Sequence, residues 1–189
     1  MFHKIAKICQ TIFIVALCVY ALTLIWCPEI YAAETMTIKG KARVIDGDTI
    51  EINGEKIRLL CIDTPESNYR GRTQYCLDNE TDCGKIAKKA LKQFINRKDV
   101  WCEYEKRDMY GRILGMCQEY SYFNTYPYWG TYNYMMIRNG YAWYYPGGKK
   151  CEPFQKAFEE SKEEERGLFD EDLGGFKEPK LWRKTRSND

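Results

Sequence analysis

The stretch TIKGKARVIDGDTIEINGEKIRLLCID, residues 37–63, sets the expected architecture of the chain. Apolar and polar residues alternate along it, as they do in strands that bury one face. Two dipeptides, Asp46-Gly47 and Asn53-Gly54, reach positive φ at low cost and therefore favour tight turns. The stretch predicts three short strands joined as an antiparallel meander.

The residues that follow predict two more strands and several helices. Residues 84–97 place apolar side chains at helical spacing with lysines on the opposite face, and Asp82 precedes them as a candidate N-cap. Residues 100–104 and 113–118 are typical of two strands around a turn, and residues 132–138 and 152–166 of helices, the second ending before Gly167. Five strands with a helix between the third and fourth predict an α+β chain, mainly a five-stranded OB-fold barrel with about three helices.

The first residues have the layout of an export signal. Lys4 and Lys7 precede an uncharged apolar run over residues 8–26, and small residues follow at Ala32 and Ala33. The run is also nearly long enough to span a bilayer. Residues 1–33 are therefore predicted to be an apolar leader helix, either a cleaved signal peptide or a membrane anchor through residues 8–26.

Both interpretations of the leader place the rest of the chain outside the cytoplasm, because the positive residues precede the apolar run. The protein is accordingly expected to be secreted or periplasmic, or else tethered to the membrane. Residues 34–170 form the predicted folded domain, and residues 171–189 form a C-terminal tail. No linker divides the chain after the leader.

Cysteine usage agrees with an oxidising compartment. Six of the nine cysteines follow the leader, and an even number after an export signal predicts disulfides. Cys102 and Cys117 flank the predicted hairpin symmetrically, and Cys76 and Cys83 bracket a short polar loop. Cys61 and Cys151 then remain as the third pair. A zinc site is the alternative, but the sequence has no C-x-x-C pair and no histidine after the leader.

Charge and histidine content exclude several mechanisms. The single histidine, His3, lies in the leader, so the folded domain has no imidazole for acid–base catalysis or metal binding. The net charge is only +2, so any nucleic-acid partner must meet a local basic patch. Catalysis, if present, must come from carboxylates, arginine, lysine, hydroxyl groups or cysteine.

Four short motifs contain the candidate functional residues. They are D-G-D-T at residues 46–49, R-L-L-C-I-D-T-P-E at residues 58–66, D-M-Y-G-R at residues 108–112 and R-N-G-Y-A at residues 138–142. Taken singly, each motif also fits an ordinary turn or the end of a strand. Their order and spacing carry more information than any one of them.

Together, the four motifs resemble the thermonuclease (micrococcal-nuclease-like) family over residues 42–169. R-L-x-x-I-D-T-P-E followed about fifty residues later by D-x-Y-G-R is a specific combination. The resemblance implies a calcium-dependent OB-fold endonuclease that acts on DNA or RNA, preferably single-stranded, and leaves 3′-phosphate ends. We expect the protein to act as a monomer.

The resemblance assigns roles to eight positions. The catalytic residues it implies are two arginines and a general base: Arg58, Arg112 and Glu66. The Ca2+ ligands it implies are two carboxylates and one backbone carbonyl: Asp48, Asp63 and Thr64. The residues implied to line the nucleotide pocket are Tyr110 and Tyr144.

The chemistry of these residue types is consistent with phosphodiester hydrolysis. Calcium takes oxygen ligands, which aspartates and a carbonyl supply. Guanidinium groups bind phosphate oxygens in pairs and stay charged at any working pH. A carboxylate can accept the proton of an attacking water, so no histidine is needed.

Three features leave alternatives open. The same fold with weak catalysis would make a nucleic-acid-binding module. The aromatic segment over residues 118–131 could stack bases or pack as a lid. The tail carries Lys177, Lys180, Arg183, Lys184 and Arg186 around Trp182, which could attract nucleic acid, dock through the tryptophan or fray.

Overall fold

The computed structural model describes residues 12–18, 20, 35–122 and 128–185. The chain divides into two units, residues 1–34 and residues 35–189. In the first unit, residues 12–18 are helical, and the rest of the predicted leader lies outside the described residues apart from Tyr20. Within the described part of the chain, no helix is long and apolar enough to cross a membrane.

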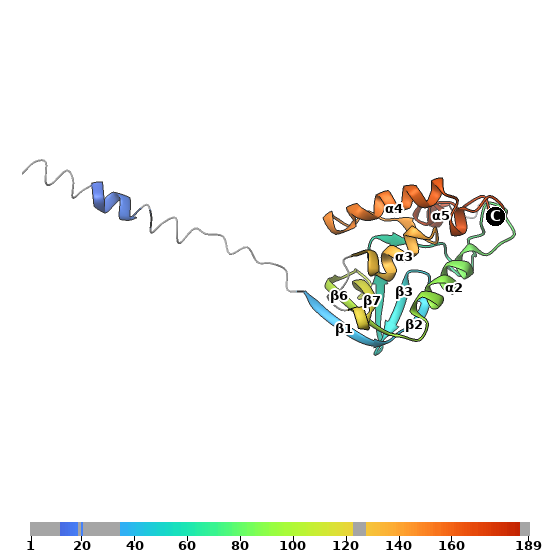
Figure 1. Cartoon of the computed structure of the whole chain (residues 1–189), viewed down its shortest axis with the longest axis horizontal. Helices are drawn as coiled ribbons and strands as arrows, with labels where there is room; N and C mark the ends of the chain where they lie inside the picture. Colours follow the sequence, from blue (N-terminus) through green and yellow to red (C-terminus); the bar gives the residue numbers. More distant parts are fainter. Residues whose placement is uncertain (1–11, 19, 21–34, 123–127, 186–189) are drawn as a thin grey trace, which may run out of the picture. The chain divides into compact units, whose positions relative to one another are not determined.

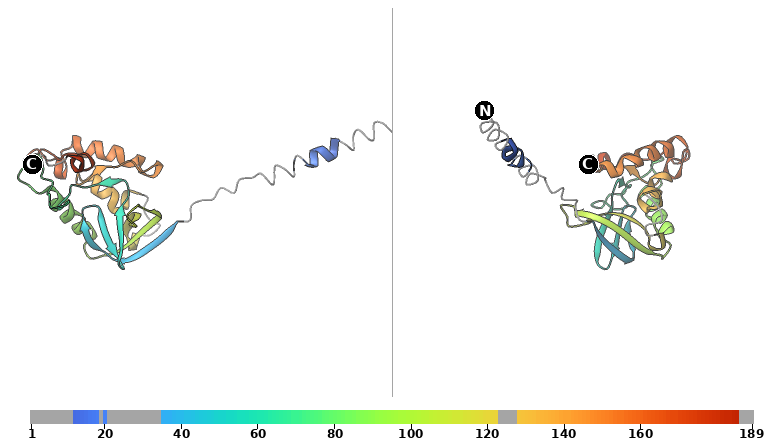
Figure 2. Two further views of the ribbon diagram at one scale, coloured as in Figure 1. Left: turned by 180° about the vertical axis from the view of Figure 1, so that it is seen from behind. Right: turned by 60° about the vertical axis from the view of Figure 1, so that its left-hand side comes forward.

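The second unit is built on a six-stranded sheet in the order β1-β6-β7-β4-β3-β2. Figure 2 shows this sheet curled into a half-barrel. All its neighbours are antiparallel except β4 and β7, which are parallel. The strands are β1 Met36–Lys41, β2 Arg43–Asp46, β3 Thr49–Ile52, β4 Glu55–Leu59, β6 Asp99–Arg107 and β7 Ile113–Glu119. A second sheet pairs β5 Ile62–Asp63 with β8 Trp143–Tyr144.

The predicted meander is confirmed as β2-β3-β4, with one difference in its turns. Asn53 and Gly54 take positive φ values of 52° and 82°, as expected of the second turn. Gly47 in the first turn does not. A Cβ there would lie 2.8 Å from the Thr64 hydroxyl oxygen and 2.9 Å from the Ala87 Cβ. Close packing, and not backbone conformation, therefore requires glycine at position 47.

The structure has more strands and helices than the five strands and about three helices that the sequence predicts. β1 pairs with β6 at the sheet edge, and residues 62–63 leave the main sheet to pair with β8. The described helices of this unit are α2 Cys83–Ile95, α3 Tyr132–Arg138, α4 Glu152–Glu163 and α5 Pro179–Lys184. α5 lies in the segment predicted as a tail, and α4 ends three residues before the predicted end because Glu165 turns to positive φ.

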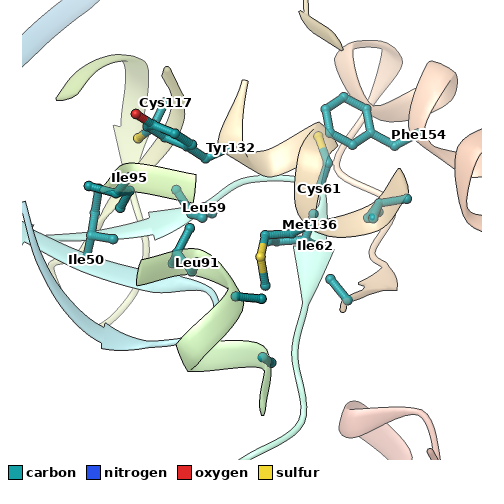
Figure 3. Packing of buried hydrophobic residues seen from close by; sticks show 14 of the residues in the cluster. Ile50, Leu59, Cys61, Ile62, Leu91, Ile95, Cys117, Tyr132, Met136 and Phe154 are labelled. Atoms are coloured by element: carbon teal, nitrogen blue, oxygen red, sulfur yellow. The ribbon is translucent and has the colours of Figure 1, made fainter. Parts of the chain in front are cut away.

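The helices cover one side of the sheet. α3 lies between the sheet and α4 (Figure 1). Leu91 and Ile95 of α2 and Met136 of α3 are buried with sheet residues such as Ile50 and Leu59 (Figure 3). The predicted N-cap of α2 is confirmed, because the Asp82 side chain accepts the Lys85 N–H at 2.9 Å. The helix begins one residue before the predicted range and ends at Ile95, two residues before its predicted end, because Asn96 turns to positive φ.

Three disulfides join the predicted cysteine pairs. Cys102–Cys117 links directly opposed residues of β6 and β7. Cys76–Cys83 ties the preceding loop to the start of α2, and Cys61–Cys151 closes a separation of 90 residues. Long closures restrict the unfolded chain most. The three bonds point to an oxidising compartment.

The aromatic segment is described only in part. Tyr128 packs against Tyr134 and Phe154, with ring centroids 5.4 Å and 5.9 Å apart, so it belongs to the packed interior. Trp129 and Tyr120 are exposed. Phe123 and Tyr126, which were candidates for base stacking, lie outside the described residues.

Asn133 of α3 ties the helix to the junction of the parallel strands. Its side chain is fully buried. Its Nδ2 donates to the carbonyls of Leu60 and Gly115, and its Oδ1 accepts the Cys117 N–H, each at 2.9 Å. These bonds satisfy backbone groups where β4 and β7 diverge.

Replacing Asn133 by alanine should lower the free energy of unfolding by about 2–3 kcal/mol, because buried backbone groups would lose their partners. Urea unfolding of the oxidised protein measures this. Asn139→Ala is the matched control, since Asn139 is exposed and donates to a single carbonyl, that of Met135. Equal losses in both variants would contradict the role given to Asn133.

Candidate active site

The residues predicted to bind the cation and the water come from β4, β5 and the turns next to these strands. Asp48 follows β2 in the turn to β3, and Arg58 lies in β4. Asp63 ends β5, and Thr64 and Glu66 follow it. The antiparallel pairing places Thr49 opposite Arg58, and the Leu59 N–H donates to the Asp48 carbonyl at 2.8 Å. The backbone itself therefore brings the Asp48 turn against β4.

Asp48 and Asp63 are joined by the guanidinium group of Arg58. Its Nη1 lies 2.9 Å from Asp48 Oδ2, and its Nη2 lies 2.5 Å from Asp63 Oδ1. Both aspartates are buried, with exposures of 5% and 1%. Buried carboxylates are costly unless they are paired, and this fork pairs both.

Asp48 is held in its charged form. Burial alone would raise the pKa of Asp48, but the charge of Arg58 and the hydrogen bonds from Thr64 and Thr49 outweigh it, so the pKa lies below its usual range. The Thr64 N–H donates to Asp48 Oδ2 at 3.1 Å, and the Thr49 hydroxyl donates to Oδ1 at 2.8 Å. Burial also acts against the charged form of Arg58, but Asp48 and Asp63 raise the pKa of Arg58 above its ordinary value.

Glu66 lies beside this pair of aspartates. Burial and the negative charge of Asp48 raise the pKa of Glu66 above its ordinary value. One oxygen, Oε1, accepts a hydrogen bond from Arg183 Nη1 at 2.8 Å. The Glu66 backbone is fixed by Gln74, whose N–H donates to the Glu66 carbonyl at 2.9 Å.

Helix α2 approaches the Glu66 loop closely. A Cβ at Gly84 would lie 2.3 Å from the Ser67 nitrogen and 2.4 Å from the Glu66 carbonyl carbon. Only glycine fits there without moving the backbone. Gly84 therefore sets how closely helix α2 packs against the backbone of Glu66. No local pattern indicates this role, because the glycine lies within a helical pattern.

Arg112 is positioned by its own turn. Asp108 Oδ2 accepts from Arg112 Nε at 2.7 Å and pairs with its Nη2 at the same distance. Asp108 Oδ1 also accepts the N–H groups of Tyr110 and Arg112, which closes the turn. The charge of Arg112 is a smaller cause that also lowers the pKa of Asp48.

The two predicted pocket tyrosines make no bond to the carboxylates in the described part of the chain. Tyr110 is 77% exposed, and the Arg112 guanidinium lies 5.6 Å from its ring centre. Tyr144 is half-buried in β8, opposite Ile62. Among the described residues, no hydrogen bond or ion pair joins either tyrosine to Asp48, Asp63 or Glu66.

Two hollows lie in the folded unit. One of about 240 Å³ is bordered by Arg58, Lys106 and Tyr145. A larger one of about 440 Å³ is lined by residues such as Trp101 and Met116, and no predicted site residue lines it. Of these two hollows, the smaller is the one that a predicted site residue, Arg58, lines; Asp48, Asp63 and Glu66 line neither.

Sequence reasoning missed the role of Arg183. Its Nη2 lies 2.7 Å from Asp63 Oδ2, and its Nη1 lies 2.8 Å from Glu66 Oε1. The sequence of the tail predicts a basic segment that attracts nucleic acid, docks through Trp182 or frays, and none of these alternatives assigns a contact to Arg183. No local pattern could reveal the contact, because Arg183 and Glu66 are 117 residues apart.

The residues present are compatible with a calcium ion. In the described part of the chain, no group of three or more His, Cys, Asp or Glu residues is arranged to hold a metal. Asp48 and Asp63 nevertheless each place an oxygen against the same guanidinium, that of Arg58. Carboxylate and carbonyl oxygens are hard ligands that suit calcium, with water completing the coordination.

Comparison with known proteins identifies the family. The profile described as staphylococcal nuclease homologue matches residues 56–171, more than half of the chain. An uncharacterized endonuclease of Escherichia coli is 32% identical over 131 residues, which cover 67% of this chain and 73% of the relative. Endonuclease YhcR of Bacillus subtilis is 30% identical over 142 residues, covering 68% of this chain and 11% of the relative.

Succinoglycan biosynthesis protein ExoI of Rhizobium meliloti is 44% identical over 84 residues, or 42% of this chain. The match spans 41% of that relative's length. The motif-based resemblance is confirmed by these matches. The chain belongs to the staphylococcal nuclease homologue family, and this membership implies the OB-fold barrel expected from the sequence.

Proposed function

We propose that this protein is an exported, calcium-dependent endonuclease that hydrolyses phosphodiester bonds of DNA or RNA, preferably single-stranded, and leaves 3′-phosphate ends. The observation that carries the proposal is the arrangement of Asp48, Arg58, Asp63 and Glu66 in one cluster. Two similar proteins are named endonucleases, which supports the same class of reaction. The three disulfides favour an extracytoplasmic site of action, secreted, periplasmic or at the membrane.

In this proposal Asp48, Asp63 and the Thr64 carbonyl hold the calcium ion. Calcium, when bound, supplies positive charge next to the phosphate oxygens. The two aspartates suit this role because Asp48 stays ionised despite its burial. Preorganised carboxylates do not have to be assembled when the cation arrives.

Arg58 and Arg112 stabilise the negative charge that builds on the phosphate during hydrolysis. Each is already oriented by an aspartate: Arg58 by Asp48 and Asp63, and Arg112 by Asp108. A guanidinium held in place loses little freedom when it binds a phosphate oxygen. Tyr110, exposed beside Arg112, and Tyr144 border the substrate in this proposal.

Glu66 acts on the attacking water. It accepts the proton of that water or orients it toward the phosphorus atom. Its raised pKa brings its basicity closer to that needed at neutral pH than an ordinary glutamate's. No covalent intermediate is needed.

Purified protein should cleave single-stranded DNA when calcium is present and stop when a chelator is added. Gel analysis measures cleavage. Treatment of the products with a phosphatase should be required before their 3′ ends can be extended by a polymerase. Binding without cleavage, by folded and oxidised protein in calcium, would favour a nucleic-acid-binding module instead.

Arg58→Ala, Arg112→Ala and Glu66→Gln should each lower kcat by about 100- to 1,000-fold, because each removes a group that acts in the transition state. Steady-state kinetics on a fluorescent oligonucleotide measures the effect. Arg43→Ala is the control, since it removes the same charge from an exposed pair with Glu51. If the control loses as much activity as the site variants, the assigned roles are wrong.

Gly84→Ala should lower kcat by about 100-fold, because the new Cβ displaces the backbone that carries Glu66. Kinetics and the melting temperature are measured together. Gln93→Ala, at an exposed position of the same helix, should be fully active. A fully active and stable Gly84→Ala variant would show that Glu66 does not depend on this close approach.

A further inference from the structure

Helix α5 brings a third guanidinium to the candidate active site. Arg183 contacts both Asp63 oxygens, through Nη2 at 2.7 Å and Nη1 at 3.2 Å. The same Nη1 donates to Glu66 Oε1 at 2.8 Å. One side chain thus bridges the aspartate assigned to the cation and the glutamate assigned to the water.

The segment that carries Arg183 is packed in place by contacts that do not involve the carboxylates. Gln74 Nε2 donates to the Lys177 carbonyl at 2.7 Å, and the Leu77 N–H donates to the Gly175 carbonyl at 2.9 Å. At the other end, Arg72 Nη1 donates to the Thr185 carbonyl at 2.8 Å. The segment is thereby fixed to the loop that follows Glu66.

Aromatic contacts add to this anchoring. The Trp182 ring packs edge-on against Tyr69 at 6.5 Å, and the Arg72 guanidinium lies 4.8 Å from the Trp182 ring centre. Tyr69 and Arg72 belong to the same loop. The position of Arg183 is therefore set by packing on both sides, and its side chain is only 21% exposed.

The charges explain what Arg183 does there. Asp48, Asp63 and Glu66 place three carboxylates close together, and like charges repel. Arg58 pairs with Asp48 and Asp63. Among the described side chains, only Arg183 forms an ion pair with the Glu66 carboxylate. Without it, Glu66 would turn away from Asp63 or would turn to a cation bound there.

We propose that Arg183 is a positioning residue of this active site, which holds Glu66 beside Asp63 and keeps Glu66 free to act on water instead of binding the calcium ion. This inference rests on the proposed nuclease function. Arg183 and calcium compete for the Asp63 oxygens, whereas Glu66 Oε1 remains available to the guanidinium. Loss of Arg183 therefore strengthens calcium binding and weakens catalysis at the same time.

The test compares Arg183→Gln, Arg183→Lys and Lys184→Gln in the full oxidised protein. Lys184 is the matched control, because it is the exposed neighbour on the same helix and carries the same charge. At saturating calcium, kcat of Arg183→Gln should fall about 10- to 100-fold with little change in the KM for a single-stranded oligonucleotide. Arg183→Lys should recover part of the loss, and Lys184→Gln should match the unaltered protein.

Calcium calorimetry gives a readout that does not depend on cleavage. Arg183→Gln should bind calcium more tightly than the unaltered protein, and Lys184→Gln should not. Tighter calcium binding by Arg183→Gln with unchanged or increased kcat would overturn the proposal. It would show that Arg183 competes with calcium for Asp63 without helping catalysis. Unchanged calcium affinity would also overturn the proposal.

The two proposals can fail separately. If the unaltered protein binds calcium but does not cleave nucleic acid, the nuclease function fails. The calcium affinities of the variants then decide by themselves whether Arg183 keeps Glu66 from binding the calcium ion. If the unaltered protein cleaves and Arg183→Gln cleaves equally well, only the role of Arg183 fails. Melting temperatures identify a loss that is due to unfolding.

Discussion

The site depends on one interaction, the pairing of the Arg58 guanidinium with two buried aspartates. Asp48 lies in the β2-β3 turn and Asp63 at the end of β5, and their burial would be unfavourable without a common positive partner. Because the fork of Arg58 fixes both, it also fixes the distance between the loops that carry them. The roles proposed for the calcium ion and for the attacking water depend on that distance.

The fold supports this interaction from three directions. The β2-β3-β4 meander places the Asp48 turn against β4, and Gly47 allows that turn to pack on Thr64. Gly84 lets α2 press against the Glu66 loop. Helix α5, fixed to the same loop, adds a second arginine that pairs with Asp63 and Glu66. Asp63 is thus paired with two guanidinium groups that come from distant parts of the sequence.

Local patterns predicted much of this fold because they depend on neighbouring residues. The meander, the span of α3, the N-cap of α2 and all three disulfide pairs agree with the structure. The pairing of β1 with β6, the separate β5-β8 sheet and helix α5 were not predicted, since each depends on contacts between distant segments. The motifs indicated Asp48, Arg58, Asp63 and Glu66. Docking of the tail through Trp182 was one of the predicted alternatives and agrees with the structure, but the contacts of Arg183 were not predicted.

The central claim is that Asp48 and Asp63 form one calcium site. Isothermal titration of the oxidised protein with calcium tests it most directly, with Asp48→Asn and Asp63→Asn as variants and Asp99→Asn as the control, because Asp99 is exposed and paired with Lys41. The account predicts that the unaltered protein and the control bind calcium and that both site variants lose most of the affinity. Calcium binding that is unchanged in Asp48→Asn or Asp63→Asn would contradict it.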